Sequence, residues 1–329
     1  MEKRENKGNG KMAEIVMEND CKRRKRQGKE REKQEALWNK TQKRARVKRK
    51  ARQIIVTGAL FLTALIISVP LILLISGSLK GTDELKSALE PVLSGMNAMV
   101  EFGLFPKYPT LKHWIELLFD KPEYYVVFVN SLKIVAGTLL GQLLVGVPSA
   151  WAFARFSFPG RKFLFTVYIS LMMMPFSVTM LSNYLVLKDL SLLDNLWGII
   201  LPGVFSTFPV FIMYRGFCGI PKELLEAAKV DGAGEFQVFW RIGLPLGSAG
   251  IGSALVLGFL EYFSLIEQPL VFLKDRSLWP LSLYLPQIGL SDAGFAFAAS
   301  VMGLIPAVFV FLLGQDYLEK GIIATGMKE

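Results

Sequence analysis

Six long stretches without a charged residue constrain the fold of this 329-residue chain more than any other feature. They cover residues 53–79, 134–154, 163–187, 195–214, 242–260 and 293–315. A helix of about 20 apolar residues is long enough to cross the hydrocarbon core of a bilayer, and each stretch reaches that length or comes close. The sequence therefore predicts an all-α membrane protein with six transmembrane helices.

The positive charge of the chain is concentrated at its N-terminus. Residues 1–53 hold 20 Lys and Arg against 8 Asp and Glu, whereas residues 54–329 hold 18 against 20. A segment this polar cannot bury a core, so we expect residues 1–53 to be a disordered cytoplasmic tail. Basic runs also follow nucleic-acid phosphates. The tail adjoins the first apolar stretch directly, however, which favours an anchor that obeys the positive-inside rule and contacts anionic membrane lipids, with no nucleic-acid partner.

Loops that alternate across the membrane organise the rest of the chain. Residues 54–78 are the expected first transmembrane helix, because the stretch is too long and too far from the N-terminus for a signal peptide. Residues 79–125 are then an extracellular loop, and residues 126–329 hold five more transmembrane helices. The polar loop 215–241 and both termini fall in the cytoplasm. We expect a multi-pass protein of the cell membrane.

Proline and glycine residues inside the spans predict how the helices bend and pack. Pro175 lies within the third stretch, and neighbouring helices can satisfy the carbonyls that a proline frees. We therefore expect such prolines to kink their helices rather than break them. Gly137 and Gly141 have the GxxxG spacing that permits close approach of a second helix.

Few residues of this chain suit catalysis or metal binding. It holds two Cys, Cys21 in the basic tail and Cys218 beside the cytoplasmic loop, and one His, His113. Neither a structural disulfide nor a Cys/His metal cluster is expected. No phosphate-binding loop of the GxxxxGK type is present, so any ATP would be bound by another subunit. We expect no cofactor in this chain and no enzymatic activity of its own.

The cytoplasmic loop 215–241 contains a predicted amphipathic helix. Pro221 suits the first turn, where its missing N–H costs nothing. Glu223 and Glu226 favour the positive end of the helix dipole, and Gly232 ends the helix. The predicted apolar stripe consists of Leu224, Leu225, Ala228 and, less strictly, Val230. A small face at Ala227 and Ala228 could lie close against another protein.

The same loop reads Glu-Ala-Ala, three residues, Gly, nine residues, Ile, one residue, Leu-Pro. The matching positions are Glu226, Ala227, Ala228, Gly232, Ile242, Leu244 and Pro245. This spacing resembles the EAA signature of membrane subunits of ATP-binding-cassette (ABC) importers. Further motifs resemble carbohydrate permeases of the MalG kind: Asn-Ser-Leu at 130–132, the run 150–160, Met-Met-Met-Pro at 172–175 and the closing segment 321–326.

The resemblance covers about residues 100–329 and implies the fold, function and partners of such a permease. The fold would be that of a type I importer permease, with the EAA segment as a coupling helix that docks on the nucleotide-binding subunit. Carried over residue by residue, the docking contact would be made by Glu226, Ala227, Ala228, Asp231 and Gly232. The implied partners are ABC ATPase subunits, a second permease subunit and an extracellular solute-binding protein. The implied cargo is a sugar or oligosaccharide.

The fifth stretch departs from that family pattern near its outer end, where family members commonly show a Trp-Asn-Asp-like segment. Here the chain carries Glu261, about 25 Å along a helix from Leu244, which puts its carboxylate near the membrane surface. Glu261 is a weak candidate for substrate contact, and pairing with the second permease is the other explanation. Glu267 follows it without an assigned role.

Two other classes of protein compete with the importer subunit. A stand-alone secondary transporter or channel predicts paired ionisable residues near the middle of the membrane and inverted repeats, and neither pattern is visible. A membrane-bound enzyme would need a catalytic cluster. At the loop itself, the alternative is that Glu226 and Asp231 only cap and solubilise a surface helix.

Overall fold

The computed structural model describes residues 38, 49–50, 52–93 and 103–326, and the described residues form helices, turns and loops. The chain divides into two compact units, residues 1–70 and 71–329. The basic tail that the sequence predicts to be disordered lies almost wholly outside the described residues. Within the described part, five helices are long and apolar enough to cross a membrane. They are Arg52–Ser78, Pro122–Arg155, Trp197–Cys218, Glu235–Phe263 and Ala293–Gly321.

Several of these spans contain more than one helical element. The span Pro122–Arg155 consists of α4 (Pro122–Gly141), η2 (Gln142–Gly146) and α5 (Val147–Arg155), and the span Trp197–Cys218 contains α8 (Trp197–Val204) and α9 (Thr207–Cys218). The span Glu235–Phe263 consists of α11 (Glu235–Val238), η3 (Phe239–Gly243) and α12 (Leu244–Phe263), and the last span lies in α15 (Ala293–Gly326). Between the first two of these lie α6 (Arg161–Met172) and α7 (Phe176–Asp189). The second span begins well before the uncharged stretch 134–154, because a helix can carry Glu123 and Lys133 on its exposed side.

The third predicted span is broken rather than kinked. α6 and α7 meet at an angle of 103°, with Met173, Met174 and Pro175 between them. Pro175 has extended backbone, with ψ 150°, and precedes the first residue of α7. Proline lacks the N–H that would continue the helix and disfavours helical backbone at the residue before it. The expectation of a kink at Pro175 was therefore wrong.

Glycines allow the central helices to approach one another closely. A Cβ added at Gly141 would lie 2.2 Å from Cγ2 of Val204, and one at Gly137 would lie 3.0 Å from Cδ1 of Ile200, so the GxxxG face of α4 packs directly on α8. This confirms the packing role expected for that spacing. α9 and α12 approach just as closely, since a Cβ at Gly216 would lie 2.9 Å from Cα of Gly250.

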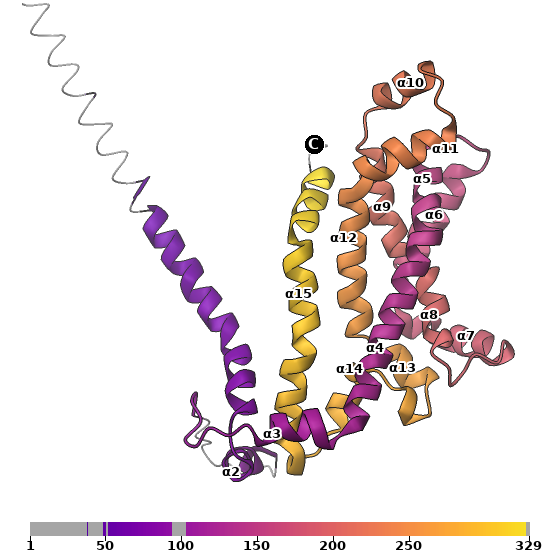
Figure 1. Ribbon diagram of the computed structural model, residues 1–329. Coiled ribbons are helices and arrows are strands. Elements are labelled where there is room, and N and C mark those ends of the chain that lie inside the picture. Colours follow the sequence, from indigo (N-terminus) through magenta and orange to yellow (C-terminus); the bar gives the residue numbers. More distant parts are fainter. Residues whose placement is uncertain (1–37, 39–48, 51, 94–102, 327–329) are drawn as a thin grey trace, which may run out of the picture. The chain divides into compact units, whose positions relative to one another are not determined.

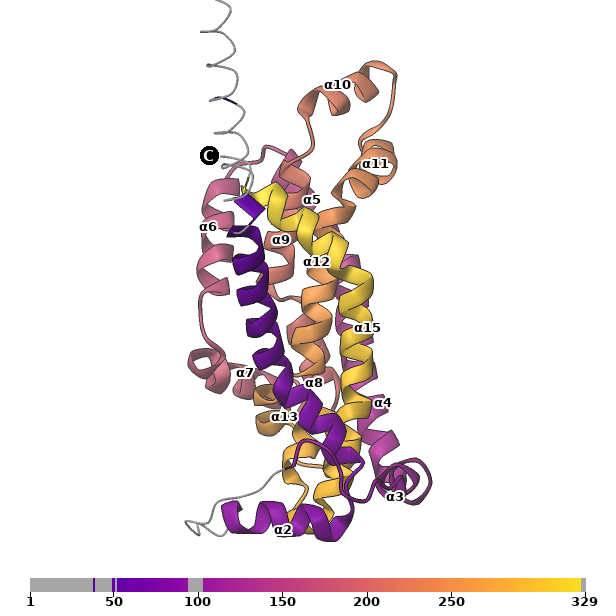
Figure 2. The ribbon, with the colours of Figure 1, turned by 90° about the vertical axis from the view of Figure 1, so that its left-hand side faces the viewer.

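The short elements of unit 71–329 gather at the two ends of the long helices (Figure 1). α10 (Lys222–Val230) and α11 lie at one end, which we call the α10 end, together with the C-terminal end of α15. The opposite end, called the α3 end, carries α2 (Thr82–Leu93), α3 (Lys112–Ile115), η1 (Glu116–Asp120), α13 (Glu267–Phe272), η4 (Arg276–Leu278), α14 (Leu281–Tyr284), η5 (Leu285–Gln287) and η6 (Leu290–Asp292). Figure 2 shows the same separation from the side.

Each end has its own buried core. The Trp151 cluster serves the α10 end and joins α5, α9, α10 and α12 through Val147, Ala150, Trp151, Val210, Met213, Phe217, Ile220, Leu225, Val238 and Ala254. The Tyr124 cluster serves the α3 end and joins α4, α12, α14 and α15 through Leu117, Tyr124, Val127, Val135, Tyr262, Phe263, Leu281, Phe295, Ala298 and Ala299. A helix such as α10 is therefore seated by contacts at its own end of the unit.

Candidate functional site

α10 is a short helix with well-defined ends. Pro221 immediately precedes its first residue with extended backbone, and Asp231 follows its last residue. Gly232 then adopts a φ of +85°, a left-handed conformation that glycine tolerates best. The backbone N–H of Gly232 donates to the carbonyl of Lys229 at 3.0 Å, which satisfies a carbonyl at the end of the helix. The start at Pro221 and the stop at Gly232 are confirmed.

One side of α10 packs on the Trp151 cluster and the other faces away from it. Leu225 is 8% exposed and belongs to that cluster, and Ala228 is partly buried against it. Leu224 and Val230, which the sequence placed in the same apolar stripe, are 49% and 87% exposed. α10 lies at the edge of the unit, and Leu224 lines a cavity beneath it instead of packing on the core.

Four of the five predicted docking residues are exposed. Glu226 and Ala227 lie on α10, Asp231 and Gly232 directly follow it, and Ala228 is half-buried. Exposed carboxylates beside small side chains leave the backbone of the helix open to close approach by another protein. The geometry therefore presents a rigid, accessible helix of nine residues.

Two aromatic side chains next to this helix were missed at the sequence level. Phe236 and Trp240 are exposed, and their rings stack with centroids 6.2 Å apart and planes 17° from parallel. An ion pair between Lys229 and Glu235 links α10 to α11 beside them. The signal was available, since the run Phe236 to Trp240 places aromatic residues in an otherwise polar loop.

A small apolar cavity of about 270 Å³ lies beneath the start of α10. It is bounded by α9, α12 and the first turn of α10, and its lining includes Gly216, Pro221, Leu224, Leu246 and Gly250. The cavity explains why Leu224 keeps half of its surface accessible. It also leaves free space under the N-terminal turn of α10, while Leu225 holds the next position against the core.

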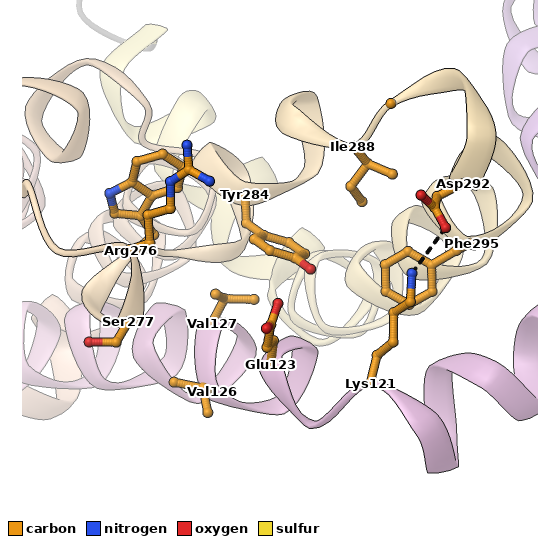
Figure 3. Close-up of a pocket in the computed structure, with 12 residues that line it drawn as sticks. Lys121, Glu123, Val126, Val127, Arg276, Ser277, Tyr284, Ile288, Asp292 and Phe295 are labelled. Carbon is orange, nitrogen blue, oxygen red and sulfur yellow. Dashed lines mark hydrogen bonds and ion pairs between the residues drawn. The ribbon is translucent and has the colours of Figure 1, made fainter.

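A larger pocket of about 510 Å³ lies at the α3 end (Figure 3). Lys121 extends across it to Asp292, with 3.1 Å between Nζ and Oδ1, and also lies 3.3 Å from Oε1 of Glu116. The ammonium group of Lys121 covers the ring of Phe295 at 4.3 Å, and the guanidinium of Arg276 covers the ring of Trp279 at 5.4 Å. These cations cover one face of each of the two rings.

The charges of this pocket stabilise one another. Burial would lower the pKa of Lys121, but hydrogen bonds and charge attraction from Asp292 and Glu116 outweigh burial and raise it. The hydrogen bond from Lys121 chiefly lowers the pKa of Asp292. Burial, together with the negative charge of Glu123, raises the pKa of the Tyr284 hydroxyl. The ion pairs of Lys121 with Glu116 and Asp292 therefore connect η1 to the residue that directly precedes α15.

Glu261 stands apart from both of these features. It lies in the last turn of α12, is exposed, and is not among the residues that line the pocket at the α3 end. Its position near the end of the helix matches the distance expected from Leu244. Whether its carboxylate meets substrate or a second subunit stays a prediction. Among the described residues, no three His, Cys, Asp or Glu side chains gather closely enough to hold a metal ion.

Known proteins resemble this chain in sequence and in fold. The family described as binding-protein-dependent transport system inner membrane component matches residues 142–324. The arabinooligosaccharides transport system permease protein AraQ of Bacillus subtilis is 29% identical over 263 residues, 79% of this chain and 90% of the relative. The sn-glycerol-3-phosphate transport system permease protein UgpE of Yersinia pestis is 30% identical over 210 residues, 62% of this chain and 74% of the relative. The same fold occurs in a chain from the crystal structure of a bacterial ABC transporter involved in the import of the acidic polysaccharide alginate. The two chains superpose with a TM-score of 0.67 and are 22% identical, and the match covers 82% of this chain and 96% of the other.

Proposed function

The chain belongs to the family of binding-protein-dependent transport system inner membrane components, and from this premise we propose that it is the permease subunit of an ABC importer for a sugar or oligosaccharide. It couples ATP hydrolysis in a partner subunit to alternating access. The observation that carries the proposal is the exposed helix α10, whose residues keep the EAA spacing and whose inner side is seated on the core by Leu225.

In this proposal α10 is the coupling helix. Its docking contact with the ATPase is made by Glu226, Ala227, Ala228, Asp231 and Gly232. ATP, bound by the partner, draws the two ATPase subunits together and displaces α10. Because Leu225 and Ala228 pack on the Trp151 cluster, the displacement passes to α5, α9 and α12 instead of being absorbed by a loose loop. Hydrolysis resets the arrangement, as in other transitions between two packed states. This chain performs no catalysis and binds no cofactor.

In this proposal the two ends of the unit face different partners. The α10 end and both termini lie in the cytoplasm, where α10 meets the ATPase pair and the basic tail contacts anionic lipid, with no nucleic-acid partner. The α3 end faces outward toward a solute-binding protein. A second permease subunit completes the pathway, and a heterodimer fits a chain to which no substrate residue can be assigned.

The identity of the cargo is the most specific part of the proposal. The name of AraQ refers to arabinooligosaccharides, which supports a sugar, whereas that of UgpE refers to sn-glycerol-3-phosphate. Uptake of labelled oligosaccharide in competition with glycerol phosphate distinguishes the two classes. Glu261→Gln tests the remaining candidate contact, since unchanged uptake and assembly in that variant would remove Glu261 from the substrate pathway.

The experiment for the proposed function uses the purified complex, with wild-type chain or with Glu226→Arg combined with Asp231→Arg. A matched control reverses two exposed carboxylates elsewhere, Asp120→Arg with Asp189→Arg. We expect the ATPase to co-purify with wild type and control and to be lost, together with ATP-driven uptake, in the α10 variant. If no ATPase co-purifies under any condition that preserves the complex, the importer is excluded and a stand-alone secondary transporter or channel takes its place.

A further inference from the structure

Arg155, the last residue of α5, reaches across to the end of α9. Its Nη2 donates to the carbonyl of Ile220 at 2.8 Å and also to the carbonyl of Phe217. These carbonyls lie where α9 ends, directly before Pro221 and the first turn of α10. The sequence analysis included Arg155 in the permease-like run 150–160 and gave it no role of its own. The structure shows that it binds residues 217–220, the segment that leads into α10, which we call the root of α10.

The chemistry of this contact favours arginine in particular. The last carbonyls of a helix have no partner within the helix and carry partial negative charge, so a cation is stabilising there. The guanidinium is planar and presents several N–H donors in a fixed arrangement, which lets one side chain hold two carbonyls at once. A lysine would supply the charge as a single flexible point.

Aromatic packing fixes the guanidinium in place. Arg155 lies 5.6 Å from the ring of Trp151, and Trp151 meets Phe217 edge to face at 5.3 Å. A Cβ at Gly243 would lie 2.7 Å from Cζ3 of Trp151, so η3 also presses directly on this ring. Three separate segments, α5, the end of α9 and η3, therefore converge on Trp151.

The covalent chain connects α10 to only two of the helices that it must move. Residues 219–221 lead back to α9, and residues 231–234 lead forward into the span Glu235–Phe263. α5, the end of the span Pro122–Arg155, is far from α10 along the chain and joins its root through side chains. α5 already meets α10 through the apolar Trp151 cluster, and the hydrogen bonds of Arg155 add a direct polar contact with the residues that precede α10.

We propose that Arg155 is the positioning residue that ties the root of α10 to the α4–α5 span, so that displacement of α10 moves this span together with α9 and α12. The inference rests on the proposed function of α10 as coupling helix and goes beyond it, because it assigns a role in transmission to a residue outside the EAA segment. Loss of the tie leaves docking and ATP hydrolysis intact and uncouples them from transport.

The test measures ATP hydrolysis and substrate uptake by the same purified complex in proteoliposomes, for wild type, Arg155→Gln and Arg155→Lys. Lys162→Gln is the matched control, since Lys162 is an exposed cation in the first turn of the next helix, α6. In Arg155→Gln we expect the ATPase to co-purify and hydrolysis to stay within about twofold, while uptake per ATP falls roughly tenfold, the size of a typical coupling between sites. Uptake per ATP in Arg155→Lys should lie between the values for wild type and Arg155→Gln, and Lys162→Gln should behave as wild type.

A second measurement reports the tie independently of transport. Hydrogen exchange at the amides of Gly219 and Ile220, which bond to the carbonyls of Arg215 and Phe217, should quicken about tenfold in Arg155→Gln and not in Lys162→Gln. Unchanged uptake per ATP in Arg155→Gln, with a coupled wild type, would overturn the proposal, as would unchanged exchange. If wild type itself shows no ATP-driven uptake, the proposed function fails, whereas quickened exchange would still establish the tie.

Discussion

The two ends of unit 71–329 each have an apolar core with rings packed edge to face, and they differ in their polar contacts. At the α10 end, a guanidinium holds backbone carbonyls and helices meet through glycine. At the α3 end, carboxylates and amides hold loops. Oδ1 of Asp194 accepts the backbone N–H groups of Lys274 and Asp275 at 2.9 and 2.8 Å, and Asn130 donates to the carbonyls of Ser277 and Trp279 at 2.7 and 3.3 Å.

These contacts give the two ends different mechanical properties. Arginine stays charged near neutral pH and closely packed helices deform little, so the α10 end has the stiffness that the proposed coupling requires. The polar contacts described at the α3 end each hold a single loop segment to a helix or turn. Such a contact can open at modest cost without disturbing the helices beneath, as the proposed contacts of this end with a partner and a cargo would require.

The largest effect is expected from crowding the helix contact at the α10 end. Gly216→Val places side-chain atoms where the backbone of Gly250 lies 2.9 Å from an added Cβ. Overpacking of this kind costs about 1–3 kcal/mol or more, because neither backbone can withdraw. The thermal unfolding midpoint in detergent should fall by about 5 °C or more. Gly58→Val is the control, since nothing lies within 4 Å of a Cβ there, and an equal fall in both variants would contradict the close contact.

A smaller effect is expected from releasing one loop at the α3 end. Asn130→Leu removes both hydrogen bonds from Asn130 to the segment 277–279 and leaves two carbonyls without that donor. The local cost is about 1–3 kcal/mol. Trypsin should cut after Lys274 or Arg276 several-fold faster, while the unfolding midpoint changes less than in Gly216→Val. Unaltered cleavage would show that Asn130 does not hold this loop.

The smallest effect is expected from the ion pair of Lys121 and Asp292. Both side chains are partly exposed, at 32% and 45%, so Asp292→Asn should cost no more than about 1 kcal/mol at neutral pH. The pKa of Asp292 is lowered from its ordinary value of 3.8, so the stabilisation is present above that pH and is lost as the pH falls below it. The pKa of Lys121 is raised from 10.5, so the stabilisation is lost only above that pH. Unfolding midpoints of wild type and variant should converge below about pH 4. A difference that persists unchanged well below that pH would exclude the pair as its cause.

Local signals explain what the sequence could predict. Six uncharged stretches predicted an all-α membrane protein, and the EAA spacing indicated the importer permease fold, which the likeness to a solved transporter chain confirms. Pro221 and Gly232 set the ends of α10 within one short segment, and the EAA spacing identified the family. Each of these patterns is complete within a few dozen residues.

What could not be predicted depends on contacts between distant parts of the chain. Asn130 holds a carbonyl 147 residues away, Asp194 holds an amide 80 residues away, and Arg155 holds a carbonyl 65 residues away. Nothing in the neighbourhood of these residues indicates their partners. The break at Pro175 was missed for another reason, since hydropathy stays continuous through it and only backbone geometry distinguishes a break from a kink. Which side of α10 faces outward likewise depended on how the helix is seated.

A photo-crosslinking amino acid placed at Val230 tests directly whether α10 is the surface on which the ATPase docks. Val230 is 87% exposed on α10, and the control position, Phe119, is 79% exposed at the α3 end. Both replacements exchange an exposed apolar side chain for another, so assembly should survive in each. Irradiation of the intact complex should join the chain to an ABC ATPase from position 230 and not from position 119. Capture of an ATPase from position 119, or failure to capture one from position 230 in a complex that contains it, would contradict the account.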